Sequence, residues 1–371
     1  MEGHVWLLSA VGPRLVTTLL AGLGLVLLAG GGELLVRGAS RLARRWGVSP
    51  LVIGLTVVAF GTSAPELAVS VRAALTGGSD LALGNVVGSN ILNVLLILGV
   101  SALITPLVVH QRIVRIDVPL MIGASIVVAL LGLDGQLGRL DGLFLGGAVI
   151  AYTTWAIVAS RREPAEGDAE AGQAPGNGAW WPPALQVLGG LVLLVLGARW
   201  LVAGAVELAR WAGVGELVIG LTVVAAGTSL PEIAASIVAA VRGERDIAVG
   251  NVVGSNLFNL LAVLGATSLL APAGVDVAPS ALRFDVPVMI AVAVACLPVF
   301  MHGGGIARWE GALFLAYYGA YVAYLVLDAS QHESLGAFRV ALVWFALPLT
   351  GVTLAVMAWR AWPRSRRAAS S

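Results

Sequence analysis

Apolar residues in this chain are gathered into runs of about 20 residues, separated by short polar segments. A run of that length crosses the roughly 30 Å hydrocarbon layer of a bilayer as a helix. The pattern therefore predicts an all-α integral membrane protein. We predict ten membrane helices and an eleventh near the end of the chain, at 15–38, 48–74, 80–104, 116–133, 140–160, 184–206, 214–241, 246–271, 284–302, 309–328 and 338–360.

The polar segment between the fifth and sixth predicted helices differs from the others. Residues 161–183, RREPAEGDAEAGQAPGNGAWWPP, are rich in Gly, Ala, Pro and charge, which is typical of a flexible linker. This segment divides the chain into two domains of five helices each, at 15–160 and 184–328.

The two domains are copies of one another. A shift of 166 positions lays residues 51–99 on residues 217–265, with 32 of the 49 residues identical. Because each copy has five membrane helices, an odd number, the second copy has to enter the membrane in the opposite sense. The sequence therefore predicts two inverted repeats.

The placement of charge gives the orientation. The loops on one side of the predicted membrane hold more arginines than the loops on the other, and by the positive-inside rule the first side is cytoplasmic. The chain then lies in the cell inner (plasma) membrane with its N-terminus outside and the linker inside. The arginines of these loops are Arg41, Arg44, Arg45, Arg112, Arg115, Arg161, Arg162, Arg242, Arg245 and Arg308.

Composition agrees with this class and excludes others. Hydrophobic residues make up 58% of the chain and charged residues 12%, with a mean hydropathy of +0.92, which is outside the range of soluble domains. Every basic residue is an arginine in a scattered position, so we expect the lipid bilayer, and no nucleic acid, as a partner. The single cysteine, Cys296, excludes an internal disulfide.

One short motif places a glutamate inside an apolar helix. In GTSAPELAVSV, Glu66 follows Ser63 by three residues and Thr62 by four, so two hydroxyls and the carboxylate share one helix face. An ionised carboxylate in the bilayer interior costs about 3 kcal/mol or more unless a cation, a proton or water compensates it. The motif recurs in the second half, with Thr228, Ser229 and Glu232.

The prolines of these motifs predict a break in the helix. Pro65 has no N–H to donate, so the carbonyl near Gly61 loses its helical partner, and Pro231 acts in the same way near Gly227. Broken helices at matching places in two inverted halves are what transporters use to build a dehydrated cation site near the midplane.

The following helix of each half adds further oxygen atoms. In GNVVGSNILN, Ser89 and Asn93 are four residues apart on one face, and Ser255 and Asn259 repeat the pair. We predict that the glycines of these motifs, at 84 and 88 and at 250 and 254, bring the neighbouring helix close. We also expect the flanking polar residues Asn85, Asn251, Asp80 and Asp246 to cap helices or to line an ion entrance.

The oxygen-rich set favours a hard cation as the transported substrate. Two glutamates, two asparagines, four hydroxyls and several carbonyls suit Ca²⁺, which takes about 6–8 oxygen ligands. Mg²⁺ gives up its water reluctantly, and without paired Cys or His residues zinc and copper are disfavoured. We therefore expect Ca²⁺ and its counter-ion to be carried as substrates, with no resident cofactor.

Together, the paired GTSxPE and GNVVGSN motifs resemble the sodium/calcium exchangers of the cation/calcium antiporter superfamily, in their short prokaryotic form. The resemblance covers residues 15–328 and implies exchange of Ca²⁺ for Na⁺ by alternating access. Some exchangers of the family carry an aspartate where this chain has Asn259, which leaves this site with two acids. Carried over position by position, the resemblance implies as cation ligands Thr62, Ser63, Glu66, Ser89, Asn93, Thr228, Ser229, Glu232, Ser255 and Asn259, with the carbonyls of Ala59 and Ala225.

Other functions stay open at this stage. Exchange of protons for Ca²⁺ is the nearest alternative, because two glutamates can carry protons, and K⁺ can accompany Na⁺ in exchange. An intramembrane enzyme would need a nucleophile with its base, or metal ligands, at membrane depth, whereas His110, His302 and His332 fall near loops. A duplicated, inverted architecture also disfavours a passive channel.

Overall fold

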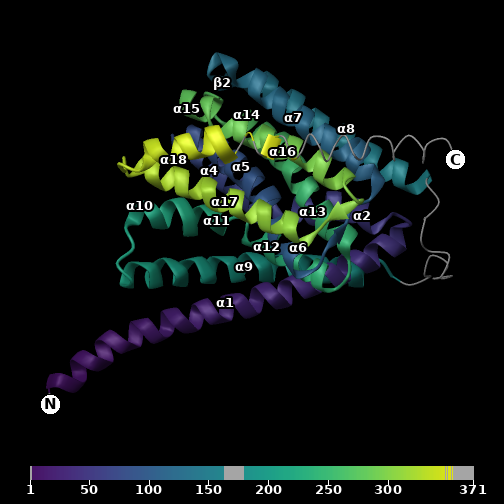
Figure 1. Cartoon of the computed structure of the whole chain (residues 1–371). Coiled ribbons are helices and arrows are strands. Elements are labelled where there is room, and N and C mark those ends of the chain that lie inside the picture. The colour runs from purple at the N-terminus through teal and green to yellow at the C-terminus, as the bar shows by residue number, and fades with distance from the viewer. Residues whose placement is uncertain (1, 163–178, 347, 349, 352, 354–371) are drawn as a thin grey trace.

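The computed structural model describes residues 2–162, 179–346, 348, 350, 351 and 353, which are almost entirely helical (Figure 1). The first half contains α1 (Glu2–Trp46), α2 (Pro50–Ile53), η1 (Gly54–Val58), α3 (Ala59–Thr62), α4 (Ala64–Leu75), α5 (Ser79–Leu92), η2 (Asn93–Leu98), α6 (Gly99–Ile104), β1 (Leu107–Val108), η3 (Ile113–Asp117), α7 (Val118–Leu131), η4 (Gly132–Asp134), β2 (Gln136–Leu137) and α8 (Arg139–Arg162). The second half contains α9 (Trp181–Trp211), α10 (Glu216–Ile219), η5 (Gly220–Val224), α11 (Ala225–Gly227), α12 (Leu230–Val241), α13 (Arg245–Phe258), η6 (Asn259–Val263), α14 (Leu264–Leu270), β3 (Val275–Asp276), α15 (Pro279–Arg283), α16 (Asp285–Met301), β4 (Gly305–Ile306), α17 (Arg308–Ala329), α18 (Leu335–Ala341) and η7 (Leu342–Ala346).

The helices occupy the positions that the apolar runs predict. Within the described residues, eight helices are long and apolar enough to cross a membrane, and up to ten if each of two bent helix pairs is one span. The chain is therefore a multi-pass membrane protein. Residues 347, 349, 352 and 354–360 of the predicted span 338–360, and residues 163–178 of the predicted linker 161–183, lie outside the described residues.

Local chemistry sets the helix ends. Gly47, with φ of +62°, adopts the left-handed conformation directly after α1, and it does so without the steric penalty that a Cβ would bring. Ser49 then caps α2, because its hydroxyl accepts a hydrogen bond from the Val52 N–H at 3.3 Å. Pro50 follows at the first position of the helix, where its missing N–H does no harm.

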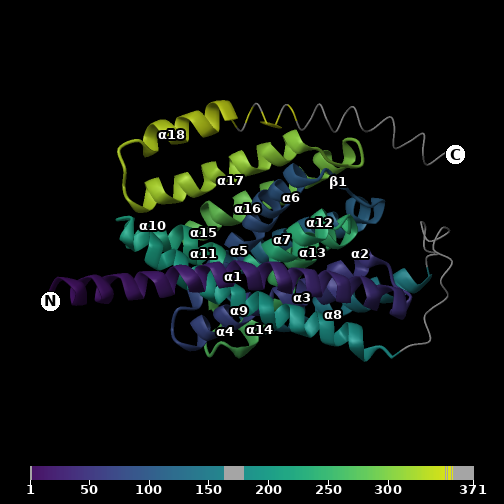
Figure 2. The ribbon, with the colours of Figure 1, turned by 90° about the horizontal axis from the view of Figure 1, so that it is seen from below.

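The long helices α1 and α9, which begin the two halves, lie side by side (Figures 1 and 2). A Cβ added at Gly24 would meet the Gly197 carbonyl at 2.8 Å, and one at Gly31 would meet the Gly190 carbonyl at 2.9 Å. Because later residues of α1 contact earlier residues of α9, the two helices run antiparallel. Glycine alone allows this approach, since the backbones themselves are in contact.

Two short ribbons join the halves at opposite ends of the molecule. β1 pairs antiparallel with β4, and β2 pairs antiparallel with β3. The prediction of an all-α chain is therefore correct apart from these four strands, and strands of two residues are too short to leave a periodic signal in the sequence. The β1–β4 ribbon lies at the end of the molecule that holds the arginine-bearing loops (Figure 2).

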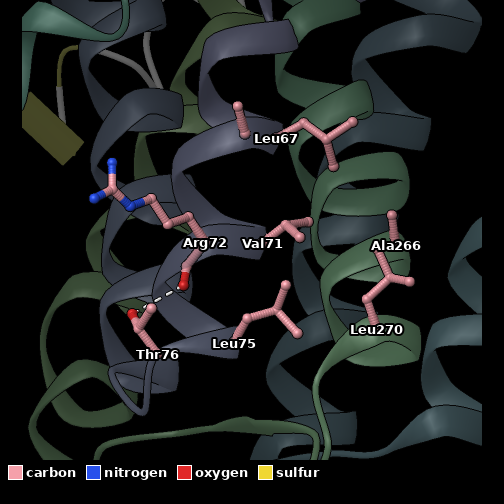
Figure 3. Close-up of a pocket in the computed structure, with 8 residues that line it drawn as sticks. Leu67, Val71, Arg72, Leu75, Thr76, Ala266 and Leu270 are labelled. Carbon is pink, nitrogen blue, oxygen red and sulfur yellow. Dashed lines mark hydrogen bonds between the residues drawn. The ribbon is translucent and has the colours of Figure 1, made fainter.

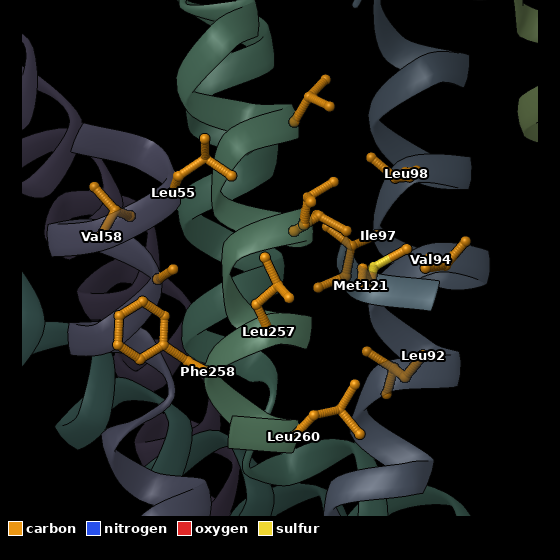
Figure 4. Packing of buried hydrophobic residues seen from close by; sticks show 14 of the residues in the cluster. Leu55, Val58, Leu92, Val94, Ile97, Leu98, Met121, Leu257, Phe258 and Leu260 are labelled. Atoms are coloured by element: carbon orange, nitrogen blue, oxygen red, sulfur yellow. The ribbon is translucent and has the colours of Figure 1, made fainter. Parts of the chain in front are cut away.

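The two helices that carry the GNVVGSN motifs form the centre of the fold. The apolar stretch of Arg245–Leu270 is 94% buried, and that of Ser79–Ile104 is 72% buried, whereas only 6% of the stretch in α17 is buried. Figure 4 shows apolar side chains, among them Leu55, Leu257 and Ile97, gathered around the central helices. The polar motifs are thus held at the most protected place in the chain.

Equivalent segments of the two halves are packed differently. On α13, a Cβ at Gly254 would meet the Leu55 carbonyl of η1 at 2.5 Å, and one at Gly250 would meet the Leu51 carbonyl of α2 at 2.8 Å. On α5, a Cβ at Gly84 or Gly88 would meet no described atom within 4 Å. The prediction that these glycines bring helices together is correct for the second half and wrong for the first.

The facing half-helices show the same difference. Gly54, Leu55, Thr56 and Val58 of η1 are buried against α13, whereas no residue of η5 or α11, all of which are described, is buried. One half-helix is therefore tightly packed, and its counterpart stands off from α5.

Candidate functional site

The two bent helix pairs carry the glutamate motifs at their breaks. Pro50–Thr62 and Ala64–Leu75 meet at 41°, and Glu216–Gly227 and Leu230–Val241 meet at 54°. The turn residues, Ser63 and Ser229, have ψ of 4° and 6° in place of the helical value. Pro65 and Pro231 follow at the start of the next helix, where they donate no hydrogen bond to the preceding turn.

Both glutamates are buried, and each bonds across to the other half. Glu66 is 0% exposed and Glu232 is 1% exposed. Glu66 Oε1 accepts a hydrogen bond from Ser229 at 3.0 Å, and Glu232 Oε1 accepts one from Ser63 at 3.2 Å. Since each serine lies three residues before the glutamate of its own half, the crossed bonds bring both acidic side chains to one place.

The remaining predicted hydroxyls lie around these two bonds. Ser229 Oγ is 3.2 Å from Ser89 Oγ. Thr62 Oγ1 donates to Asn251 Oδ1 at 3.2 Å and is 3.5 Å from Ser255 Oγ. The structure therefore brings the hydroxyls of both halves into one buried group.

Thr228 is more weakly placed than its counterpart Thr62. Its hydroxyl reaches Asn85 Oδ1 at 3.5 Å, and the residue is half-buried where Thr62 is fully buried. The difference follows the looser packing of η5 and α11 against α5.

Two predicted asparagines complete the group. Asn93 and Asn259 are both 0% exposed, and each stands at the point where its helix widens into a π-helical turn, η2 or η6. Four oxygen atoms of the site have no hydrogen-bond partner among the described residues. They are Glu66 Oε2, Glu232 Oε2, Asn93 Oδ1 and Asn259 Oδ1.

The two main-chain ligands that the resemblance implies differ in their surroundings. The Ala59 carbonyl accepts bonds from the Ser63 N–H at 3.0 Å and from the Thr62 hydroxyl at 3.4 Å. Ala225 begins α11 and is exposed.

The expectation that Asn85 and Asn251 cap helices is wrong, because neither is the N-cap residue of its helix. Both lie inside the bundle: Asn85 donates to Ser70 Oγ at 3.0 Å, and Asn251 donates to Ser236 Oγ at 2.9 Å, so each ties its helix to the glutamate helix of its own half. Asp80 and Asp246 stand in the first turns of α5 and α13, but the N-cap residues are Gly78 and Glu244 and neither helix has a side-chain cap hydrogen bond, so the expectation that the two aspartates cap helices is wrong as well.

Sequence reasoning also missed Asn90 and Asn256, whose amides contact Asn259 and Asn93. Both stand in the motif GNVVGSN, which is identical in the two halves, three residues before a predicted ligand. Identity between the repeats, together with spacing on a helix face, could have identified them.

A groove elsewhere on the protein is unsuited to cations. It has a volume of about 540 Å³ and lies between α4 and α14, with Leu67, Val71, Leu75 and Leu270 facing it (Figure 3). Its lining is apolar apart from Arg72 and Thr76. Among the described residues, moreover, no three His, Cys, Asp or Glu side chains converge. The paired glutamates are therefore the best candidate for a cation site.

The protein-family comparison agrees with this geometry. The model of the family described as "Sodium/calcium exchanger protein" matches residues 16–158 and 183–327, which take in both bent helix pairs and both central helices. The chain belongs to the sodium/calcium exchanger family. The two matched segments correspond closely to the two repeats that the sequence predicts.

Similar proteins of this family come from several prokaryotes. The chain is 41% identical over 320 residues to "Putative antiporter CaxA" of Alkalimonas amylolytica, covering 84% of this chain and 98% of that protein. It is 34% identical over 339 residues to "Sodium/calcium exchanger MaX1" of Methanosarcina acetivorans, covering 82% and 96%.

A solved structure of an exchanger has the same fold. The sodium-calcium exchanger NCX_Mj, soaked with 10 mM Na⁺ and 10 mM Sr²⁺, superposes with a TM-score of 0.72 at 32% identity, covering 83% of this chain and 98% of that one. The resemblance to prokaryotic sodium/calcium exchangers is therefore confirmed. The relatives are transporters rather than enzymes, and the chain is a cation/calcium antiporter by family.

Proposed function

We propose that this protein exchanges Ca²⁺ for Na⁺ by alternating access, at a central site built from Glu66 and Glu232. The observation that carries the proposal is the crossed pair of serine–glutamate bonds, which joins the halves at two buried carboxylates. Each carboxylate keeps one oxygen without a partner in the part of the chain that the structure describes. Two acids in a low-dielectric interior repel one another unless cations neutralise them.

The chemistry of the ligands favours Ca²⁺ as one substrate. All candidate ligand atoms are oxygens, and the four unpartnered ones come in matched pairs from carboxylates and amides. A flexible set of oxygens of this kind suits Ca²⁺, which accepts irregular geometry. The surrounding hydroxyls and carbonyls suit Na⁺ as the counter-ion, as the family membership also indicates.

The unequal packing of the two halves supports alternating access. The half-helix α2–η1–α3 is packed tightly against α13, whereas α10–η5–α11 stands off from α5. In a protein made of two repeats, an exchange of these two packings would close one approach to the site and open the other. We propose that this exchange is the transport step.

We also propose an orientation of the two halves in the membrane. The antiparallel packing of α1 on α9 is what two inverted repeats of five helices each would produce. If the arginine-bearing loops are cytoplasmic and the protein lies in the inner membrane, then α10–η5–α11 lies on the outer side. The conformation described here would then face outward.

Neutralisation of the two negative charges couples the transport of Ca²⁺ to that of its counter-ion. An empty site that carries two negative charges would resist closing away from water, whereas a site filled by Ca²⁺ or by monovalent cations would close readily. Exchange rather than leak follows, because only a filled site crosses between the two conformations.

The decisive experiment replaces each carboxylate by its isosteric amide. Glu66→Gln and Glu232→Gln should each abolish Na⁺-driven Ca²⁺ uptake into proteoliposomes, while the protein still elutes as a folded species. Glu310→Gln is the matched control, because Glu310 is equally buried, at 1% exposure, and lies at the start of α17, where it bonds to His302 and the Ala307 N–H. Normal uptake by either site variant would refute the proposal.

The counter-ion is tested separately in inside-out vesicles loaded with Ca²⁺. Addition of Na⁺ at clamped pH should release the Ca²⁺. Release by acid alone, without Na⁺, would instead assign proton exchange to the same two glutamates, and a requirement for K⁺ in addition to Na⁺ would assign K⁺-dependent exchange.

A further inference from the structure

Two asparagines outside the predicted ligand set contact that set crosswise. Asn90 and Asn256 are each 2% exposed and stand about one helical turn before Asn93 and Asn259. The amide of Asn259 donates to Asn90 Oδ1 at 3.1 Å, and the amide of Asn93 donates to Asn256 Oδ1 at 3.0 Å. Each thus bonds to the ligand asparagine of the other half rather than to that of its own.

The other partners of Asn90 fix the direction of its amide. Its Nδ2 donates to the main-chain carbonyl of Asn256 at 3.3 Å and lies 3.7 Å from Met289 Sδ. A carbonyl and a thioether can only accept a hydrogen bond. If the amide of Asn90 flipped, its oxygen would face two acceptors, and both bonds would be lost. Its Oδ1 therefore has to face Asn259.

Asn256 is fixed by the mirror set of partners. Its Nδ2 donates to the main-chain carbonyl of Asn90 at 3.4 Å and lies 3.3 Å from Met121 Sδ. Met121 is 1% exposed and belongs to the apolar cluster around the central helices (Figure 4). A flipped amide would therefore place its oxygen against the buried sulfur, which accepts but does not donate a hydrogen bond.

The fixed orientation of the Asn90 and Asn256 amides also sets the orientation of the Asn93 and Asn259 amides. An asparagine amide has a donor end and an acceptor end, and the donor ends of Asn93 and Asn259 are held by the two fixed oxygens. The acceptor ends of both have no hydrogen-bond partner among the residues described. If either amide were free to flip, it would present N–H groups, which repel a cation.

We propose that Asn90 and Asn256 are positioning residues for Ca²⁺ binding, and that each orients the ligand asparagine of the opposite half so that an oxygen faces the cation. The inference rests on the proposed function, because it assigns a role around the same site. It also makes the two halves interdependent, since the amide orientation in one half is set by a side chain of the other.

The test is a set of double-mutant cycles on Ca²⁺ affinity, measured by calorimetric titration of the purified full-length protein with Ca²⁺ alone. Asn90→Leu keeps the number and the branching of the side-chain heavy atoms and removes the fixed oxygen, and we expect it to raise the Kd about tenfold, as loss of an outer-sphere partner of a metal ligand typically does. In an Asn259→Ala background the same change should alter the Kd less than about twofold, because its target is gone. In an Asn93→Ala background the effects should multiply.

A second cycle, built on Asn256→Leu, should give the opposite dependence on the two ligand asparagines. It replaces the first cycle if Asn90→Leu does not fold. Asn256→Leu should couple to Asn93→Ala and be independent of Asn259→Ala. A merely structural role would not produce this crosswise pattern. Equal coupling to both ligand asparagines, or full additivity with both, would overturn the inference. If the unsubstituted protein itself binds no Ca²⁺, the proposed function fails instead, so the two failures are distinguishable.

Discussion

Gly88 of α5 is the position at which alternating access makes its sharpest prediction. In the described conformation a Cβ at Gly88 would meet no described atom within 4 Å, whereas a Cβ at its counterpart Gly254 would lie 2.5 Å from the Leu55 carbonyl and 2.7 Å from Ala59 Cβ. When the second half-helix closes on α5, Gly88 takes the crowded place that Gly254 has now. Gly88→Ala should therefore fit the present conformation and clash in the other.

The size of the effect follows from that clash. A contact of 2.5 Å with a backbone oxygen requires main-chain movement, and overpacking of this kind costs about 1–3 kcal/mol. Such a penalty on one of two conformations shifts their equilibrium by about 5–150-fold. We expect Gly88→Ala to slow Ca²⁺ exchange in proteoliposomes by a factor in that range. Calorimetric Ca²⁺ affinity should stay within about twofold of the unsubstituted protein, because the present conformation already holds the assembled site.

The control is Gly147→Ala on α8, which also meets no described atom within 4 Å and lies away from the central helices, so exchange should be unchanged. Gly254→Ala should act in the opposite sense, because it crowds the conformation described here and favours the other. If Gly88→Ala exchanges Ca²⁺ at the normal rate, the two packings do not alternate, and the reasoning is refuted.

Three further predictions concern access, packing and charge. With Cys296 replaced by serine, Gly220→Cys, where an added Cβ meets no described atom within 4 Å, should react with a thiol reagent supplied on both sides of the membrane. Gly54→Cys at the equivalent position, where the Cβ would lie 3.0 Å from the Ile247 carbonyl, should not react, and equal labelling would contradict the open gap. Gly31→Leu would place its Cβ 2.9 Å from the Gly190 carbonyl, and we expect it to lower the free energy of unfolding by about 1–3 kcal/mol and the thermal midpoint by several degrees. Gly30→Leu, at the neighbouring position, meets no described atom within 4 Å, and we expect no change in its thermal midpoint. Because the site holds two buried acids, one Ca²⁺ or two monovalent cations neutralise it, so exchange should be electroneutral; a rate that changes when the membrane potential is clamped with valinomycin and K⁺ would contradict this count.

The positions of the helices and the site motifs could be predicted from the sequence because both depend on local patterns. Apolar runs locate membrane helices, and the duplicated motifs locate Glu66 and Glu232, since a glutamate inside an apolar membrane helix is costly unless a cation or a proton neutralises it. The crossed bonds through Ser63 and Ser229 are consistent with that assignment, because they bring the two motifs together.

The hydrogen-bond partners of polar side chains inside the bundle were harder to predict, because they depend on which helices pack together. Asn85 and Asn251 stand about two turns into α5 and α13, beyond the N-terminal positions at which a side chain caps a helix. Their contacts with Ser70 and Ser236 exist only because two helices of the same half pack together. A polar residue in a membrane helix therefore needs the packed neighbour before its role can be assigned.

The unequal packing of the halves is beyond any sequence pattern. The motif GNVVGSN is identical in both copies, yet Gly250 and Gly254 touch the neighbouring backbone while Gly84 and Gly88 do not. Under the proposed alternation of the two packings, the difference belongs to the conformation rather than to this motif. Identical local chemistry that supports two packings is what a protein alternating between two states requires.

The central claim, that Glu66 and Glu232 hold one shared group of cations, is tested most directly by locating Ca²⁺ in crystals of this protein from its anomalous scattering. The account predicts a peak between the two side chains, within about 2.3–2.6 Å of the now unpartnered Oε2 atom of each. A peak bound by only one of the two glutamates, or Ca²⁺ bound at another place with this pair empty, would contradict it.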